Sequence, residues 1–253
     1  MAALYSDAPL SLISTPHSQT GKTDDFTIDA SHMALVHNAI INGYNSIYQQ
    51  APSVKPTDYP DFISYSLAWH DMVTSHHDSE EEVFFPSLDA ATGIQGLMDG
   101  DKAEHAAFHD GMANFKTYLT TCAAAPGSFR ATELLHLMDA FGSPLHQHLL
   151  HEPAKLASLA KYPINIRAIS EETAKHTMDH TSTVNLLPML LFNLDLEFEN
   201  GKWKDFPPVP ALMRWVMVNV IAWWRAGWWR FGSCGADGRR VKLLALREEY
   251  ASG

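Results

Sequence analysis

Cysteine is nearly absent from this chain. Its 253 residues include two cysteines, Cys122 and Cys234, which lie far apart and form no C-x-x-C motif. A disulfide framework needs several cysteines, and a thiolate metal site needs closely spaced ones. The sequence therefore signals neither kind of site. It fits a reducing compartment, and we expect a cytoplasmic protein.

Basic residues are also scarce. The chain has 18 lysines and arginines against 29 aspartates and glutamates, a formal net charge of −11. Nucleic acids and anionic membranes attract proteins through clustered positive charge, so we expect neither as a partner. The first twenty residues lack a charged segment followed by an apolar one, so no secretory signal is expected. The pattern says nothing about oligomeric state.

A long hydrophobic run is missing as well. The apolar segment between Arg214 and Arg225 has about half of the ~20 residues that a membrane-spanning helix needs. We therefore expect no transmembrane segment. Four tryptophans gather around Arg225 in this region. We expect them to cover the bundle described below, with a substrate wall or an interfacial membrane contact as the alternatives.

Hydrophobic residues are plentiful, at 46% of the chain, and they recur with helical spacing. This spacing predicts helices over residues 31–48, 61–85, 101–123 and from the turn at 125–128 to about residue 159. A further helix is expected over about residues 170–194. We expect an all-α protein with an N-terminal arm over residues 1–30, a four-helix bundle over 31–160 and a helical, tryptophan-rich accessory region over 161–253.

Histidines lie one helical turn before a glutamate or a second histidine in three of these segments. The pairs are His76-x-x-x-Glu80, His105-x-x-x-His109 and His148-x-x-x-Glu152, with His37 upstream. Residues four apart project from the same face of a helix. Burying so many imidazoles and carboxylates is costly unless a cation neutralises them. The set predicts a two-metal site inside the bundle, and imidazole with carboxylate suits iron, zinc or manganese, of which we expect iron.

The second helix leaves two registers open. His77 and Glu81 have the same spacing as His76 and Glu80. The apolar stripe that includes Trp69 favours His76 and Glu80, with His77 then supporting the ligands from outside the site. A further pair, His176-x-x-x-His180, lies in the accessory region without a matching stripe of carboxylates, and we expect no second metal site there.

The string from His76 to Pro86, HHDSEEEVFFP, resembles the H-x-x-x-E-E-x-x-x-F-P signature of hemerythrin-like, HHE cation-binding proteins. The resemblance covers about residues 31–160, and the rest looks like the extension of a fungal-type branch. It implies that one iron is bound by His105, His109 and His148, that the other is bound by His37 and His76, and that Glu80 and Glu152 bridge the two. The last pair is spaced by four residues and not by five as in oxygen-carrying hemerythrins, which argues against oxygen transport.

Two classes of function fit this resemblance. The first is a non-haem di-iron oxidoreductase that binds dioxygen and activates it against a small organic substrate. Some 90 residues beyond the bundle are enough to build a substrate pocket. The alternative is a non-catalytic carrier, store or sensor of dioxygen, nitric oxide or iron. The histidine-rich ligand set favours this alternative, because carboxylate-rich sites better stabilise high-valent iron.

Overall fold

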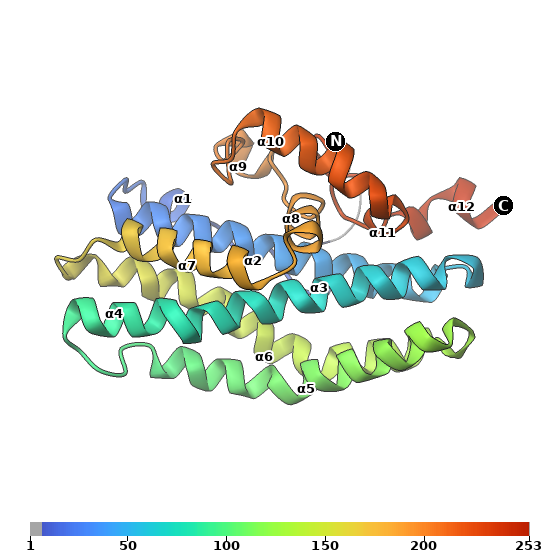
Figure 1. The fold of residues 1–253 in the computed structure, drawn as a ribbon, viewed down its shortest axis with the longest axis horizontal. Coiled ribbons are helices and arrows are strands. Elements are labelled where there is room, and N and C mark those ends of the chain that lie inside the picture. The colour runs from blue at the N-terminus through green and yellow to red at the C-terminus, as the bar shows by residue number, and fades with distance from the viewer. Residues whose placement is uncertain (1–6, 253) are drawn as a thin grey trace.

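The computed structural model describes residues 7–252, and over these residues the chain is helical and has no β-strand. Residues 1–6 of the expected arm and Gly253 lie outside the described part. Four long rods run side by side as a bundle (Figure 1). They are α2 (Asp25–Gln50), α3 (Tyr59–Ser79) with its continuation, α5 (Asp99–Ala124) and α6 (Ala131–Ser158). This confirms the prediction of an all-α bundle.

The first rod begins earlier than the sequence pattern indicated. Asp24 caps α2 by accepting a hydrogen bond from the backbone N–H of Thr27 at 3.0 Å, and the helix starts at Asp25 instead of residue 31. The preceding arm lies along this rod. Its backbone amides at Leu10 and Ile13 donate to side-chain oxygens of Asn45 and Asn38, and it includes the short helix α1 (Pro16–Thr20).

The second rod changes its winding at the predicted metal-binding motif. After α3, residues Glu80–Phe84 form a turn of π-helix, η3, and α4 (Phe85–Thr92) continues the rod beyond Pro86. The expected end at this proline was wrong, because a proline in the first turn of a helix removes no hydrogen bond of that turn. A π-turn widens the helix and shifts the direction of the side chains around it. Such turns are frequent at functional sites.

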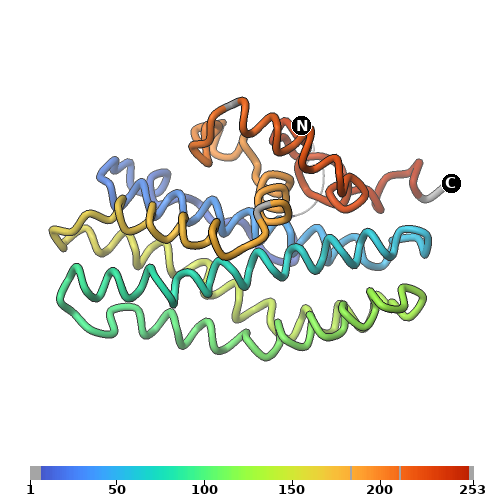
Figure 2. The backbone as a smooth tube through the Cα atoms, viewed as in Figure 1, coloured from blue at the N-terminus to red at the C-terminus, as the bar shows by residue number. Residues whose placement is uncertain are grey.

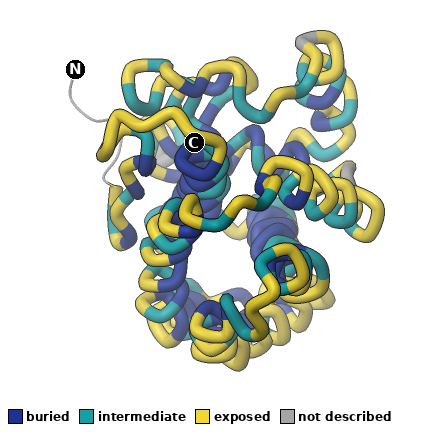
Figure 3. The backbone as a smooth tube through the Cα atoms, turned by 90° about the vertical axis from the view of Figure 1, so that its left-hand side faces the viewer, coloured by how far each residue is buried: buried dark blue, intermediate teal, exposed yellow. Residues whose placement is uncertain are grey.

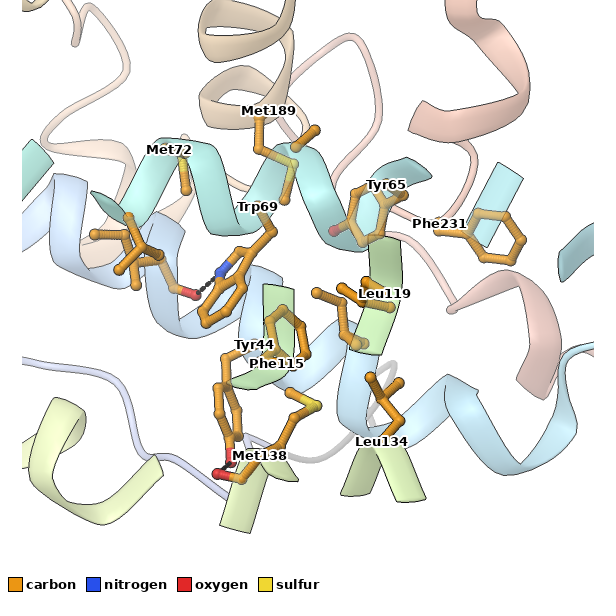
Figure 4. Packing of buried hydrophobic residues seen from close by; sticks show 14 of the residues in the cluster. Tyr44, Tyr65, Trp69, Met72, Phe115, Leu119, Leu134, Met138, Met189 and Phe231 are labelled. Carbon is orange, nitrogen blue, oxygen red and sulfur yellow. Dashed lines mark hydrogen bonds between the residues drawn. The ribbon is translucent and has the colours of Figure 1, made fainter. Parts of the chain in front are cut away.

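One half of the bundle interior is packed with aromatic side chains (Figure 4). Trp69 donates its indole N–H to the carbonyl of Ile40 at 2.9 Å, and the hydroxyl of Tyr44 donates to the carbonyl of Met138 at 2.9 Å. Gly43 makes this approach possible, since a Cβ there would lie 2.4 Å from Trp69 Cδ1. This closely packed half fixes the spacing of the rods.

The accessory region packs on one side of the bundle (Figures 1 and 2). α7 (Ile166–His180) packs against α2 and α3, and α8 (Thr183–Leu191) crosses α3. The single helix expected over residues 170–194 is broken at Thr181, whose backbone is extended.

The rest of the accessory region consists of shorter helical segments. They are α9 (Phe198–Gly201), α10 (Ala211–Val216), η6 (Met217–Ile221), η7 (Ala222–Arg225), α11 (Ala226–Trp229), η8 (Leu244–Leu246) and α12 (Glu248–Ser252). Single 3-10 turns link the rods: η1 (Ala51–Ser53), η2 (Pro56–Asp58), η4 (Pro126–Ser128) and η5 (Leu159–Lys161).

The tryptophans of the accessory region do not share one environment. Trp229 is buried against the bundle side, stacked on Phe192 with ring centroids 6.2 Å apart. Trp223 and Trp224 are 74% and 83% exposed.

Burial along the chain is shown in Figure 3, where the inward faces of the long rods are dark. Among residues 7–252, no helix combines the length and the hydropathy that crossing a membrane requires.

Candidate metal centre

The buried polar residues of the bundle converge from all four rods. α2 contributes His37, the second rod contributes His76, His77 and Glu80, α5 contributes His105, and α6 contributes His148 and Glu152. Their nitrogen and oxygen atoms form two groups, each compact enough to hold one cation. The first group is His37, His76, Glu80 and Glu152, and the second is His77, Glu80, His105 and His148.

In the first group, two imidazoles and two carboxylates face one another. The Nε2 atoms of His37 and His76 are 3.1 Å apart. Glu80 Oε1 lies 3.1 Å from His76 Nε2, and Glu152 Oε2 lies 3.2 Å from His37 Nε2. The side chains of His37 and Glu152 are fully buried. The geometry gathers four potential ligand atoms around one point.

The second group places three imidazoles beside the other oxygen of Glu80. The Nε2 atoms of His105 and His148 are 3.1 Å apart, and Glu80 Oε2 lies 3.6 Å from His105 Nε2. The ring of His77 forms a triangle with these two, with its centroid 4.5 Å from that of His105 and 5.0 Å from that of His148. Glu80 therefore belongs to both groups, with one oxygen toward each. Glu152 Oε2 is similarly within 3.8 Å of His148 Nε2 as well as close to His37.

Hydrogen bonds from outside orient three of the rings. The Nδ1–H of His37 donates to the carbonyl of Leu149 at 2.9 Å. His105 Nδ1 is 2.8 Å from Glu81 Oε1, and His148 Nδ1 is 3.3 Å from Glu104 Oε2. Because these acceptors take the proton on Nδ1, the Nε2 atom of each neutral ring presents a lone pair to the interior. Histidine ligands of metals are typically held in this way.

Burial controls the charge of these groups. It holds the pKa of His76, His77 and His148 well below that of a free histidine, and neighbouring imidazoles lower it further. These rings are therefore neutral at physiological pH. Burial, together with the nearby Glu152 carboxylate, raises the pKa of Glu80 well above its ordinary value. Neutral imidazoles beside carboxylates that repel each other are the electrostatic setting that a cation relieves.

The donor atoms that remain without partners fit a metal ion. Both ring nitrogens of His77 and all four carboxylate oxygens of Glu80 and Glu152 are buried without a hydrogen bond. Buried polar atoms are rarely left unsatisfied, because each costs about 1–3 kcal/mol. The Nε2 atoms of His105 and His148 also point at each other, while their Nδ1 atoms face Glu81 and Glu104. Divalent cations beside these nitrogen and oxygen atoms would satisfy them by coordination.

The structure does not bring His109 to the cluster. Its side chain is 79% exposed, and its Nδ1 lies 3.4 Å from Asp110 Oδ1. The buried stripe of α5 is formed by Asp101, His105, Phe108 and Met112. His109 follows Phe108 directly and points about 100° away from it, since α-helical residues are 3.6 to a turn. The one-turn spacing from His105 was therefore a misleading signal.

His77 fills the place expected for His109, and Glu81 supports the cluster from outside it. His77 is 5% exposed, whereas the side chain of Glu81 is 44% exposed and contacts His105 Nδ1. Of the two pairs that the second helix offers, His76 and Glu80 both face the cluster, whereas His77 faces it and Glu81 does not. Glu104 also supports the cluster, through His148, and the sequence analysis did not single it out. The only signal for it in the sequence is a carboxylate directly before His105, on the neighbouring face of the same helix.

Two other groups of titratable side chains lie beside the cluster, and the second of them shares His148 with it. His176 and His180 stack with centroids 4.1 Å apart, and His176 Nε2 contacts Glu82 Oε2 at 3.1 Å. Neither joins a metal-binding group among the described residues. Asp101 and Glu104 do form such a group with His148. The ammonium of Lys155 already neutralises the carboxylate of Asp101, which leaves this group without the charge that a cation would need.

Comparisons with known proteins agree with this geometry. A family model described as the hemerythrin HHE cation binding domain matches residues 29–160. The dimeric xanthone biosynthesis cluster protein R11 of Cryptosporiopsis sp. (strain 8999) is 32% identical over 245 residues, which cover 95% of this chain and 92% of that protein. No solved structure matches the chain. The chain therefore belongs to the hemerythrin family of HHE cation-binding proteins.

Proposed function

We propose that the buried cluster holds two cations bridged by Glu80 and Glu152. One cation would be held by His37 and His76, and the other by His77, His105 and His148. The observation that carries this proposal is the pair of opposed Nε2 contacts, 3.1 Å each, in His37–His76 and His105–His148. In the second pair, Nδ1 of His105 faces Glu81 and Nδ1 of His148 faces Glu104, so the two Nε2 lone pairs face each other and repel unless a cation lies near both. His109 is excluded from the proposed ligand set, and His77 takes its place.

We further propose that both cations are iron. The donor set consists of imidazoles and carboxylates without a thiolate, which suits iron, zinc and manganese and does not suit a structural zinc site. Cys122 and Cys234, which are buried and free, play no part in the site. Two buried free thiols also agree with a cytoplasmic location. When bound, a di-iron centre would supply redox chemistry with dioxygen.

The activity that we propose is dioxygen-dependent oxidation of a small organic substrate. The name of the similar fungal protein links that protein to dimeric xanthone biosynthesis, and its similarity extends through the accessory region and not only through the bundle. In this chain, the protein's own residues would hold the two ions, keep the imidazoles neutral and exclude water from the centre. A hydroxylated aromatic substrate is the class that we infer.

A non-catalytic carrier or sensor is the second candidate function. Five of the seven converging side chains are imidazoles, and a site poor in carboxylates stabilises high-valent iron less well. Such a protein would bind dioxygen or nitric oxide reversibly. It would not change an organic molecule.

One experiment separates these functions. The chain is loaded with Fe(II) without oxygen, its iron content is measured, and it is exposed to oxygen with and without a hydroxyxanthone. The proposed enzyme should contain about two irons per chain and should consume oxygen faster when the xanthone is present. A reversible optical band with no effect of the xanthone would instead support the carrier. An iron content near one per chain after full reconstitution would contradict the two-cation centre.

A further inference from the structure

A cavity of about 400 Å³ lies between the bundle and the accessory region. α3 forms one wall, which includes Asp71, Ser75 and Asp78. The end of α7 and the start of α8 form the other, which includes Thr181 and Asn185. Cavities of this size commonly hold small organic ligands. The bundle alone would leave this face of α3 open to solvent.

Specific contacts hold the two walls together. His176 Nε2 lies 3.1 Å from Glu82 Oε2, which ties α7 to the π-turn η3. The hydroxyl groups of Ser75 and Thr181 form a hydrogen bond across the cavity's edge. The extended backbone at Thr181 separates α7 from α8 and makes room for the cavity at this point. The cavity is therefore a product of the break that the sequence pattern did not predict.

The lining favours one class of ligand by its charge and hydrogen-bonding capacity. It contains three carboxylates, those of Asp71, Asp78 and Glu82, and two imidazoles, those of His176 and His180, but neither lysine nor arginine. Two cations contact the lining from outside, Lys116 at 3.9 Å from Asp71 and Arg225 at Asn185, so the three carboxylates still outnumber the nearby cations. Ionised carboxylates accept hydrogen bonds and cannot donate them. A ligand with donor groups would be bound, whereas an anion would be repelled by the like charges. Met72 and Leu186 add apolar surface, which suits the face of an aromatic ring.

The cavity lies next to the metal cluster along the same helix. Ser75 and Ser79 line it, and they flank His76 and Glu80 in sequence. Residues adjacent in a helix lie on adjoining faces. The side chain of His76 is 16% exposed, against 0–6% for His37, Glu80, His105, His148 and Glu152. His76 is thus the most exposed member of the cluster, and it lies between the cavity-lining residues Ser75 and Asp78 in sequence without lining the cavity itself.

We propose that this cavity is the substrate site and that its ligand is an uncharged, hydroxylated aromatic molecule. The role of this cavity as a substrate site rests on the proposed function, whereas the binding of such a molecule in the cavity does not. The phenolic hydroxyl groups would donate to the carboxylates, and the ring would lie against Met72 and Leu186. An aromatic acid of the same size would be rejected.

The test is calorimetric binding to the iron-loaded chain with two matched probes. 5-Methylresorcinol and 3,5-dihydroxybenzoate share a ring and two hydroxyl groups, and they differ in a methyl group against a carboxylate. Neither probe has adjacent hydroxyl groups that would chelate iron. The proposal predicts that 5-methylresorcinol binds at least about tenfold more tightly, a difference of about 1.4 kcal/mol. Equal affinity, tighter binding of the acid or no binding of either probe would overturn it.

Two variants locate the binding in the cavity. Thr74→Trp fills the cavity that Thr74 lines, and we expect it to abolish binding. Its control, Thr117→Trp, places the same ring on the exposed face of α5, and this variant should bind 5-methylresorcinol normally. Normal binding by a folded Thr74→Trp chain would place the ligand elsewhere.

A second pair of variants tests the charge of the lining. Asp71→Asn removes one negative charge from the cavity and should improve binding of 3,5-dihydroxybenzoate. Its control, Asp110→Asn, changes the fully exposed Asp110 and should leave the binding of this acid unchanged.

Iron content distinguishes the two proposals. Thr74→Trp should keep the wild-type amount of iron and the wild-type helical circular dichroism, because Thr74 is no ligand. If the wild-type chain binds the resorcinol but holds no iron, the proposed function fails and the cavity stands. If it holds about two irons but binds neither probe, the cavity assignment fails and the metal centre stands.

Discussion

The imidazole ring of His77 lies 5.0 Å from that of His148, with the two ring planes at 68°. This contact makes His77 a member of the buried cluster, although the neighbouring His76 is also a member. Two consecutive residues of a helix normally point about 100° apart. His76 and His77 both reach the cluster because they join different halves of it. His76 belongs to the group with His37, and His77 belongs to the group with His148.

His77→Ala should remove one metal ion and His109→Ala should remove none. His77 contributes to one of the two groups only, whereas His109 is exposed on α5. Metal analysis after reconstitution should give about one iron per chain for the first variant and about two for the second. Loss of iron from His109→Ala with full retention in His77→Ala would restore the ligand set that the sequence alone implied.

Glu80→Gln should disturb both ions. Its two oxygens face different groups, at 3.1 Å from His76 Nε2 and 3.6 Å from His105 Nε2. An amide lacks the charge that balances two cations, so we expect weaker binding of both and loss of their magnetic coupling, measured by Mössbauer spectroscopy. Glu152→Gln should act similarly, since Glu152 Oε2 lies near both His37 and His148. A coupled pair of normal strength in either variant would show that the glutamate does not bridge.

Glu104→Gln should weaken metal binding without removing a ligand. Glu104 accepts from His148 at 3.3 Å and from His151 at 3.0 Å, and it fixes the orientation of the buried His148 ring. Loss of such an outer carboxylate typically costs about 10–100-fold in affinity. Competition with a chelator measures this change. Glu133→Gln, at an exposed position of α6, is the control, and an equal loss in both variants would refute the positioning role.

Asp29 should make stability depend on pH. Burial raises the pKa of its carboxyl, which accepts a hydrogen bond from Ser170, from 3.8 to about 6. The folded state therefore prefers the protonated form, and its stabilising effect is present below pH 4 and is lost as the pH rises through 6. At 1.36 kcal/mol per unit, the free energy of unfolding should fall by about 3 kcal/mol across this window.

Replacement of Asp29 tests this dependence. Asp29→Asn should flatten the pH profile between about 4 and 6, measured by urea unfolding at constant metal content. The matched control is Asp25→Asn, which removes an exposed ion pair with Arg167 and should change the free energy of unfolding by about 1 kcal/mol or less. A wild-type profile in Asp29→Asn would mean that its carboxyl is already ionised in the folded state at pH 4.

The exposed and buried tryptophans should differ in their contribution to stability. Trp229 is 3% exposed, and its truncation to alanine should cost about 3–5 kcal/mol. Trp224 is 83% exposed, and Trp224→Ala should change the free energy of unfolding by at most about 0.5 kcal/mol. Both variants should retain their iron, because neither residue is among the proposed ligands. A large loss of stability in Trp224→Ala would show that this side chain is covered in solution.

The prediction from sequence was most reliable where local periodicity and burial agree. His37, His76, Glu80, His105, His148 and Glu152 all lie on apolar stripes of long helices, and the structure brings all six together. One-turn spacing alone was not sufficient. His109 has the same spacing from His105 as Glu152 has from His148, but it lies next to the buried stripe of α5 and not on it.

The sequence by itself determined the helical class of the fold, the bundle and most of the residues that converge in it, because helical periodicity is a local property of the chain. The tertiary structure decided the rest: the entry of His77, the outer contacts of Glu81 and Glu104, and the cavity beside α3. Each of these depends on the rotation of one helix against another and on the break at Thr181. Packing between distant segments sets those rotations, and no local pattern records them.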